Sequence, residues 1–429
     1  MRLATPGRAV RSAPRGLPLA GALLAVVLLI SRRPDAVTHA QFFGEDGMIY
    51  FQNVYGHGVL RTLLVPQAGY LQSFSVLAAG VAQLVPLAQA PLVTDLLAIA
   101  AQALVVALLL SDRTAAFIPD VRVRALLAAL YVAAPDEFEL DATAVNAQWH
   151  LALAALLVLL TPVPASRAGR ALDVGALLLS GLTGPFCILL APLALIQRGW
   201  RGAGFAPWWR IAVPASCAVV QLICLVAVSR HAPEGFNVIH RPMPELGATP
   251  SLFVQLIGSK LLATPLIGEP AALSLSSKTD AVLTLLALVA ALRLARTAPP
   301  ELRLTILFAG ALLVVALARP LTPSPAWTVL TEPINGNRYF AIPRLAFLAC
   351  LVWLACRHGR AIVRGGAVTL LLIVAVVAVP GGWVYGAFAD TGYAARAAAF
   401  ERAPKGTTVR FPVNPSPENG RWTMVLRKR

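Results

Sequence analysis

Long apolar runs recur along almost the whole chain and are separated by short polar turns. A membrane-spanning helix needs about 20 mostly apolar residues, and a backbone in lipid must satisfy its own hydrogen bonds, so these runs predict transmembrane helices. The runs are continuous rather than alternating, which argues against a membrane β-barrel. The pattern therefore predicts an all-α polytopic membrane protein with about 11 transmembrane helices.

Basic residues assign the two sides of the membrane. Arginines gather in the short turns between the apolar runs, which is typical of cytoplasmic loops. Arginines also precede the first run, Leu17–Ser31, and Arg32-Arg33-Pro34 follows it in place of a cleavage site, so we expect a retained anchor with a cytoplasmic N-terminus. The C-terminus is then extracytoplasmic, and we expect the protein in the cytoplasmic (inner) membrane.

This assignment divides the chain into two parts. Residues 1–385 form a multi-pass membrane domain, and residues 386–429 form a small extracytoplasmic tail. The larger outer loops of the membrane domain are residues 32–69, 135–146, 229–278 and 319–340. In the tail, residues 408–413 and 422–426 alternate partly and flank a turn-rich stretch, which predicts a small β-hairpin.

Four segments do not follow the simple up-and-down pattern. Residues 70–88 are weakly polar, and we expect an interfacial or re-entrant helix pair that does not cross the membrane. The apolar stretch between Arg170 and Arg198 has basic residues at both ends, which would place both ends on the cytoplasmic side. This predicts two short helices, 172–182 and 185–197, broken at Gly181-Leu182-Thr183-Gly184-Pro185. One long helix with a proline kink is the alternative. Short interfacial helices are expected at 45–57 and 252–266.

The composition narrows the classes of function. The chain is 58% hydrophobic and 13% charged, as expected of a membrane protein and not of a soluble domain. Its formal net charge of +16 is spread over short loops, so nucleic acid is not an expected partner. The five cysteines lie in apolar runs without metal-ligand spacing, and we interpret them as core residues.

The sequence carries no motif for a nucleotide cofactor. Neither a phosphate-cradling Gly-x-x-x-x-Gly-Lys loop nor a dinucleotide fingerprint occurs in it. The histidines do not fall at metal-ligand spacing, so no metal site is predicted, although a divalent ion held by carboxylates stays open.

The most informative stretch is Phe43-Gly44-Glu45-Asp46-Gly47, in the first outer loop. A carboxylate partly withdrawn from water among aromatic residues has a raised pKa, which suits a general base that acts on a hydroxyl group. Glu45 and Asp46 are therefore the candidate catalytic residues. The alternative is a helix N-terminus at which acidic side chains complement the helix dipole.

A second acidic segment, residues 135–141, carries four carboxylates. Placing four acids at the centre of the bilayer would cost roughly 10 kcal/mol, so this segment must be an outer loop. The loop leads into polar and aromatic residues that form a candidate sugar site, in which a tryptophan ring can stack on a sugar face: Gln148, Trp149 and His150. An ordinary interfacial tryptophan is the alternative.

Basic and aromatic residues meet at the outer end of a later span. Guanidinium groups bind phosphate oxygens through paired hydrogen bonds, so Arg338 and Arg344, with Asn337 and Tyr339, form a candidate phosphate site. The alternative is simple anchoring of the helix end at the interface. A secondary candidate phosphate site lies in the long outer loop and comprises Lys260 and Arg241.

Four motifs, taken with the number of spans, resemble one class of enzymes. The motifs are Phe43-Gly44-Glu45-Asp46-Gly47, Asn146-Ala147-Gln148-Trp149-His150, Gly181-Leu182-Thr183-Gly184-Pro185 and Asn337-Arg338-Tyr339-Phe340. The set resembles the C-type (GT-C) integral-membrane glycosyltransferases, and more narrowly a group of bacterial membrane proteins related to that class.

This resemblance implies a membrane glycosyltransferase that moves a sugar from a polyprenyl-phosphate carrier to an extracytoplasmic acceptor. It implies that Asp46 or Glu45 deprotonates or orients the acceptor hydroxyl. It further implies that the leaving lipid phosphate is neutralised by Arg338, with Arg344 or Lys260. Glu137 and Glu139 would shape the acceptor side, and the small tail favours a glycan or lipid acceptor over a protein-sized one.

Two other functions remain open from the sequence. A transporter or flippase of lipid-linked glycans needs polar residues along a path through the bilayer, whereas the predicted span centres are almost without charge. A non-catalytic membrane scaffold would not need paired acids opposite arginines. The transferase interpretation requires that acidic and basic groups from distant segments meet in one place at the outer face.

Overall fold

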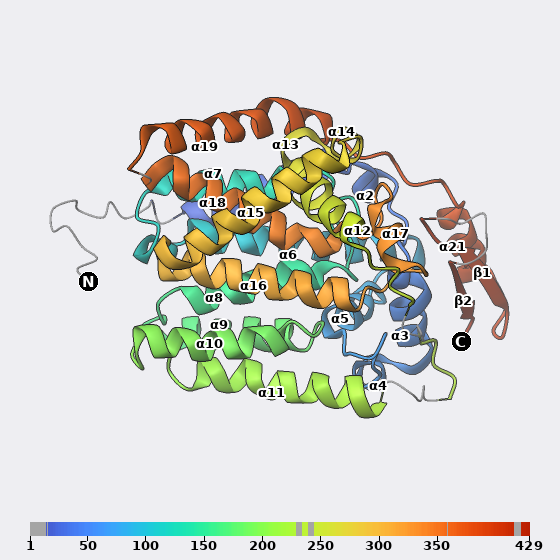
Figure 1. Cartoon of the computed structure of the whole chain (residues 1–429). Coiled ribbons are helices and arrows are strands. Elements are labelled where there is room, and N and C mark those ends of the chain that lie inside the picture. The colour runs from blue at the N-terminus through green and yellow to red at the C-terminus, as the bar shows by residue number, and fades with distance from the viewer. Residues whose placement is uncertain (1–13, 15, 229–233, 239–243, 358, 416–421) are drawn as a thin grey trace.

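The computed structural model describes residues 14, 16–228, 234–238, 244–357, 359–415 and 422–429. Helices dominate the structure, and the longer ones lie side by side in a bundle (Figure 1). The C-terminus of the chain lies at one end of this bundle. The end that carries the C-terminus is called the outer end below.

The longer helices form the body of the bundle. They are α1 (Leu17–Arg32), α6 (Ala90–Leu110), α7 (Val121–Val132), α8 (Ala147–Leu160), α9 (Arg167–Gly181), α10 (Cys187–Arg201), α11 (Trp209–Ile223), α15 (Ser277–Thr297), α16 (Pro300–Ala318), α18 (Arg338–Arg357) and α19 (Ala361–Ile373). The core between them is apolar and is centred on α8, α16 and α18.

Shorter elements connect these helices and gather mostly at the outer end. They are α2 (Asp35–Thr38), η1 (Asp46–Phe51), α3 (Gln52–His57), α4 (Val59–Leu63), α5 (Ser73–Ala82), η2 (Leu87–Gln89), η3 (Thr114–Ala116), η4 (Cys224–Val228), α12 (Pro250–Gln255), η5 (Leu256–Ala263), α13 (Thr264–Ile267), α14 (Glu269–Leu273), α17 (Ala326–Thr331), η6 (Val374–Ala378), α20 (Val379–Gly381) and α21 (Tyr393–Arg402).

Six helical segments of the described chain are long and apolar enough to cross a membrane. They are Leu87–Leu110, Trp209–Val226, Pro250–Ile267, Pro300–Ala318, Arg338–Arg357 and Ala361–Gly381. Three more apolar helices, α1, α5 and α8, are shorter. The predicted helical, multi-pass class is therefore confirmed, whereas the total of about 11 spans and the N-in orientation stay predictions.

The predicted break before Pro185 is present. α9 ends at Gly181 and α10 begins at Cys187, so both helices are longer than the sequence indicated. The backbone between them is covered by protein, because Gly184 N–H donates to Leu71 O at 2.9 Å and Gln221 Nε2 donates to Gly184 O at 3.1 Å. A helix break inside a membrane protein requires this kind of cover.

Two other irregular segments differ from expectation in detail. Residues 70–88 hold one helix of 10 residues, α5, and at 1.5 Å per residue its length of about 15 Å is half of a bilayer core. Residues 252–266, expected at the membrane surface, belong to a continuous segment, Pro250–Ile267, that is half buried and long enough to cross. The reason is a buried ion pair of Lys260, described below.

The tail forms the predicted hairpin. β1 (Thr408–Pro412) and β2 (Thr423–Arg427) are antiparallel, with Arg410 opposite Val425. The tail buries the segment 45–57, which was expected at the lipid interface. Phe51 is 2% exposed because Phe400 and Phe411 of the tail close over the same apolar cluster.

Candidate functional site

The two acidic residues of the first outer loop have different surroundings. Asp46 is buried, and the N–H groups of Ala144 and Val145 donate to its Oδ2 and Oδ1 at 3.0 and 2.7 Å. Burial raises the pKa of Asp46 to about 7, and these two hydrogen bonds oppose the shift. Asp46 therefore ties the first outer loop to the second and does not face an open site.

Glu45 is only partly buried and lies on the other side of the same turn. Its carboxylate interacts electrostatically with Arg338 and with Tyr70 and Tyr50. The turn is set by Gly44, which has a φ of +46° that favours glycine, and its N–H donates to Asn414 O at 2.7 Å. Of the two predicted catalytic residues, Glu45 is thus the less buried one and has an electrostatic interaction with the arginine.

Arg338 begins α18 and pairs with the second acidic loop. Its Nη1 lies 2.7 Å from Glu139 Oε1, and the two side chains are 20% and 15% exposed. Its Nη2 donates to Leu321 O and to the Tyr339 hydroxyl, both at 3.2 Å. Because an arginine has five N–H donors, these contacts within the described chain leave two donors for a ligand.

The acidic loop is itself braced so that Glu139 is held in place. Thr143 Oγ1 and Asn146 Nδ2 donate to the backbone oxygen of Glu139 at 2.8 and 2.6 Å. Glu139 and Arg338, from distant segments, therefore meet at the outer end of the bundle, and Glu45 interacts electrostatically with Arg338. We call these three residues the outer charged site.

Aromatic side chains form one wall next to this site. The Trp149 ring lies 5.9 Å from the Tyr339 ring and 4.9 Å from the Phe186 ring, measured between centroids. The Trp149 Nε1 donor is buried and has no partner among the described residues. An indole donor without a partner, beside a charged site, can bind an acceptor oxygen of a ligand.

Gln148 lies close to the same wall, whereas His150 does not. Gln148 forms a hydrogen bond with buried Tyr70. Gly184 makes room for Gln148, since a Cβ at position 184 would lie 2.2 Å from its Oε1. His150 Nδ1 is 2.8 Å from the Tyr131 hydroxyl inside the bundle, so this predicted sugar contact belongs to the core.

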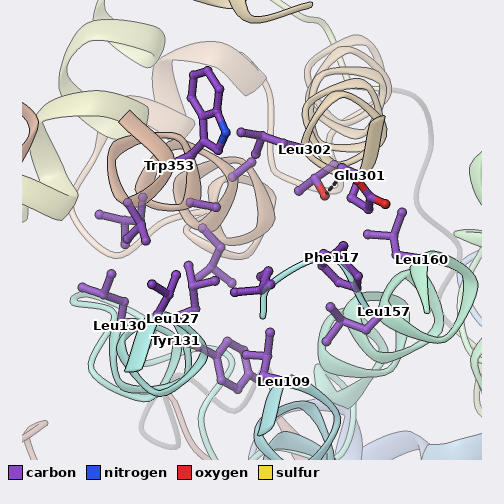
Figure 2. A pocket seen from close by; sticks show the side chains of 18 of the residues that line it. Leu109, Phe117, Leu127, Leu130, Tyr131, Leu157, Leu160, Glu301, Leu302 and Trp353 are labelled. Atoms are coloured by element: carbon purple, nitrogen blue, oxygen red, sulfur yellow. Dashed lines mark hydrogen bonds between the residues drawn. The ribbon is translucent and has the colours of Figure 1, made fainter. Parts of the chain in front are cut away.

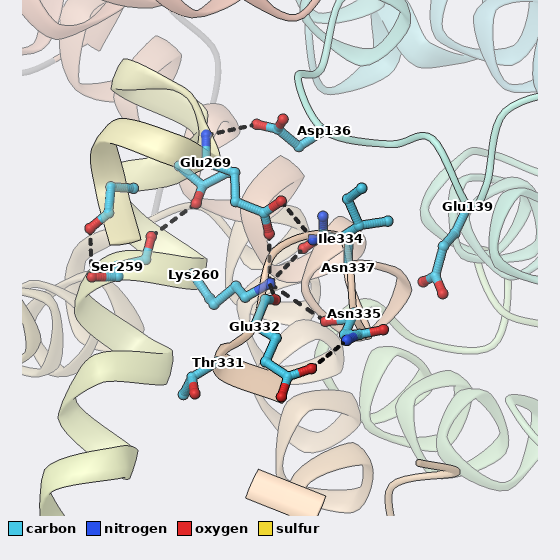
Figure 3. A network of polar contacts seen from close by, with 12 residues as sticks. Asp136, Glu139, Ser259, Lys260, Glu269, Thr331, Glu332, Ile334, Asn335 and Asn337 are labelled. Atoms are coloured by element: carbon cyan, nitrogen blue, oxygen red, sulfur yellow. Dashed lines mark hydrogen bonds and ion pairs between the residues drawn. The ribbon is translucent and has the colours of Figure 1, made fainter. Parts of the chain in front are cut away.

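The secondary phosphate candidate is a buried ion-pair network (Figure 3). Lys260 Nζ lies 2.5 Å from Glu269 Oε1 and donates to Glu332 O at 2.7 Å. Figure 3 shows these contacts converging on the Lys260 ammonium, with Glu139 apart from them. The ammonium group is already neutralised and is 0% exposed, so Lys260 supports the loop before Arg338 and does not offer its charge to a ligand.

Arg344 and Glu137 extend this network into the bundle. Arg344 Nε donates to Lys260 O at 2.8 Å, and its Nη1 lies 3.6 Å from Glu137 Oε1. Neither carboxylate oxygen of Glu137 has a hydrogen-bond partner among the described residues. Burial raises the pKa of Glu137 to about 8. Both residues are inside the protein, not in the outer charged site as the sequence suggested.

An apolar cavity of about 190 Å³ opens between α7, α8, α16 and α18 (Figure 2). Leu127, Leu157 and Trp353 are among the side chains that point into it. It follows α18 from Arg357 to Ile342, about 22 Å at 1.5 Å per residue. A smaller cavity of about 20 Å³, lined by Glu137 and Asp141, shares four residues with the end of the large cavity nearer Arg338: Tyr131, Leu153, Ile342 and Leu345.

Other residues at the outer end were not identified from the sequence. Arg33 is buried between the Phe388 and Phe138 rings and donates to Asp141 O at 2.6 Å. Tyr70, beside Glu45, belongs to a segment read only as weakly polar. The signal for Arg33 was its position directly after the first span, but Arg32-Arg33-Pro34 was interpreted only as standing in place of a cleavage site.

Three predictions remain: the absence of a metal site, and the phosphate-binding roles of Arg241 and Asn337. Among the described residues, no three His, Cys, Asp or Glu side chains lie together as a metal site would require. The predicted phosphate-binding residue Arg241 lies outside the described residues. Asn337 Oδ1 accepts a hydrogen bond from Arg344 Nη2 at 3.2 Å, so it belongs to the supporting network.

The fold and the charged outer site describe a helical membrane protein. It is similar in structure to ArnT from Cupriavidus metallidurans bound to undecaprenyl phosphate, with 17% identity and a TM-score of 0.45 over 84% of this chain and 63% of that one. It is also similar to the Archaeoglobus fulgidus oligosaccharyltransferase tethered to an acceptor peptide, with 10% identity and a TM-score of 0.45 over 91% and 58%.

These similarities are of the whole fold and are weak. The chain spans less than two thirds of the length of either protein, and at these TM-scores the likeness says nothing about site residues or substrate. No family model matches the chain, and no curated protein matches it. The residues of the outer charged site must therefore carry any functional argument.

Proposed function

We propose that this chain is a membrane glycosyltransferase that moves a sugar from a polyprenyl-phosphate carrier to an extracytoplasmic glycan or lipid acceptor. The observation that carries the proposal is the outer charged site. A carboxylate at Glu45 and a guanidinium at Arg338 interact although they are far apart in sequence. Sugar transfer from a lipid phosphate needs this pair of charges, one for a proton and one for a phosphate.

Each group has a defined role in the proposed reaction. The acceptor oxygen attacks the anomeric carbon, its proton passes to the Glu45 carboxylate, and the bond between that carbon and the phosphate oxygen breaks. The lipid phosphate leaves with its negative charge, which Arg338 stabilises through charge-assisted hydrogen bonds. Glu139 holds the guanidinium in position, and Asp46 holds the turn that carries Glu45.

The apolar cavity supports a lipid donor. α18 carries Arg338 at its outer end and lines the cavity along the rest of its length. A donor with its phosphate at Arg338 can therefore place part of its polyprenyl chain against Leu127 and Trp353, where apolar contact offsets the cost of ordering the chain. The Trp149 and Tyr339 rings offer a surface on which the sugar can stack.

The proposal is tested by replacing Glu45 with Gln in cells that depend on this chain. The Gln side chain keeps the shape but cannot take a proton, so the envelope glycan that the protein builds should be lost at normal protein levels. Glu245→Gln is the matched control, because Glu245 is an exposed acid in another outer loop. Mass spectrometry of the envelope glycans is the measurement, and an unchanged profile for Glu45→Gln would reject the catalytic role.

A further inference from the structure

The tail combines an apolar inner face with a basic outer face. Residues 386–429 contain eight basic and three acidic side chains. The basic ones are Arg396, Arg402, Lys405, Arg410, Arg421, Arg427, Lys428 and Arg429. The inner face is fixed by Phe411, Met424 and Leu426, which are at most 1% exposed in the cluster shared with η1 and α3.

The hairpin register gathers charge on the exposed face. Thr408 pairs with Arg427 and Arg410 pairs with Val425, so the two arginines are diagonal neighbours on one face. All four of these side chains are exposed. No described carboxylate lies within ion-pair distance of Arg410 or Arg427, so the structure gives these charges no partner within that part of the chain.

Membrane orientation does not explain this basic face. Arginines in the turns of a membrane protein normally mark the cytoplasmic side. In the membrane domain of this chain they cluster in the short turns between the long helices, whereas the arginines of the hairpin belong to the tail. The hairpin of β1 and β2 forms the extreme tip of the outer end of the bundle (Figure 1). Charge at the tip faces the aqueous space beyond the membrane, so it suits a polymer in that space better than lipid headgroups.

The hairpin is fastened directly to the turn that carries Glu45. The backbone of Asn414, just after β1, bridges to Phe43, and the Trp422 ring before β2 lies 3.6 Å from where a Cβ of Gly44 would be. The Gln52 side chain also accepts a hydrogen bond from Val425 N–H at 2.6 Å. A chain-like ligand on the hairpin is therefore led toward the outer charged site.

We infer that the exposed face of the hairpin binds an anionic glycan polymer, with carboxylate or phosphate groups, that serves as the acceptor. This inference rests on the proposed function, which supplies the need for an acceptor. Arg410 and Arg427 pair with successive negative groups along the polymer, because guanidinium groups bind carboxylate and phosphate oxygens in a fixed planar geometry. The remaining basic side chains of the tail draw the polymer to this end of the protein.

The test measures binding of the full chain, in nanodiscs of uncharged lipid, to polygalacturonate as a model anionic glycan. Dextran is the neutral counterpart, and phosphatidylglycerol vesicles represent an anionic lipid surface. The wild-type protein should bind polygalacturonate in a salt-dependent way and should not bind dextran. The double variant Arg410→Ser with Arg427→Ser should bind roughly 10-fold to 30-fold more weakly, given the attraction that each basic side chain adds at an anionic surface.

The matched control changes the same charge at the other end of the molecule. Arg293 and Arg364 are exposed on α15 and on α19, and the double variant Arg293→Ser with Arg364→Ser should bind as wild type does. Equal loss in both double variants, equal binding of dextran, or hairpin-dependent binding to the vesicles instead of polygalacturonate would overturn the inference.

Binding is measured without donor, so the result is independent of catalysis. If the hairpin variant keeps wild-type affinity, the acceptor inference fails while the transferase proposal stands on Glu45. If Glu45→Gln leaves the envelope glycans unchanged, the transferase proposal fails, and polyanion binding by the hairpin is judged on its own result.

Discussion

Glu137 provides the sharpest prediction, because it is a buried acid whose surroundings disfavour its charge. The side chain is 6% exposed, and its one charged neighbour within ion-pair distance in the described chain is Arg344 at 3.6 Å. Its carboxylate oxygens accept no hydrogen bond from the described residues. Replacing Glu137 with Gln keeps the shape of the protonated acid and removes the possibility of charge.

The sign of the effect follows from the raised pKa. Burial raises the pKa of Glu137 from 4.5 to about 8, so between these values the folded protein holds a proton that the unfolded chain releases. The contribution of Glu137 to wild-type stability is therefore greatest below pH 4.5 and falls as the pH rises toward 8. The full shift corresponds to an upper bound of about 5 kcal/mol, and we expect a few kcal/mol in practice.

The assay is thermal unfolding of the purified protein in detergent, followed by tryptophan fluorescence from pH 5 to 9. Glu137→Gln should match the wild-type Tm at the acidic end and exceed it at the alkaline end by several degrees. The exposed acid Glu245 supplies the control, and Glu245→Gln should follow the wild-type curve throughout. A Glu137→Gln variant that is less stable than wild type at alkaline pH would show that Glu137 is ionised and held by Arg344, which contradicts the reasoning.

Two further predictions concern stability and are also measured as changes in Tm. Lys260→Met leaves Glu269 buried without its ion-pair partner and should lower the free energy of unfolding by about 3–5 kcal/mol. The double variant Lys260→Met with Glu269→Gln should recover most of that stability. Equal Tm values for the single and double variants would refute the pairing. Gly184→Ala places a Cβ 2.2 Å from Gln148 Oε1 at a φ of +83° and should lower the free energy of unfolding by about 1–3 kcal/mol. Gly175→Ala, in the open interior of α9, is the control and should leave stability unchanged or raise it. A Gly184→Ala variant as stable as wild type would refute the close contact.

The sequence predicted the fold where hydrophobic runs and breakers act locally. The helical membrane class, the break between α9 and α10 and the hairpin at the tail all followed from apolar length, from Gly184-Pro185 and from alternation. For residues 252–266 the apolar stretch was visible in the sequence, but the buried ion pair of Lys260 was not. Its partner Glu269 lies nine residues further on, and only the fold brings the two side chains together.

The candidate site was partly predictable for the same reason. Acids and arginines that are rare in an apolar chain were visible as Glu45, Glu139 and Arg338; Glu139 and Arg338 form an ion pair, and Glu45 interacts electrostatically with Arg338. The different roles of Glu45 and Asp46 were not visible in the sequence. The Asp46 side chain accepts hydrogen bonds from backbone N–H groups of the second outer loop, because successive residues of a turn face different directions. The burial of Glu137 likewise depends on packing against α18, which local sequence does not encode.

The central claim is that Arg338 receives the phosphate of a lipid donor at the outer charged site. The most direct measurement is the affinity of the folded protein for undecaprenyl phosphate, by native mass spectrometry, for wild type, Arg338→Gln and the exposed-arginine control Arg364→Gln. We predict that Arg338→Gln binds about 10-fold or more weakly, because a charge-assisted contact is lost, and that Arg364→Gln binds as wild type does. Equal affinity of Arg338→Gln and wild type would contradict the account.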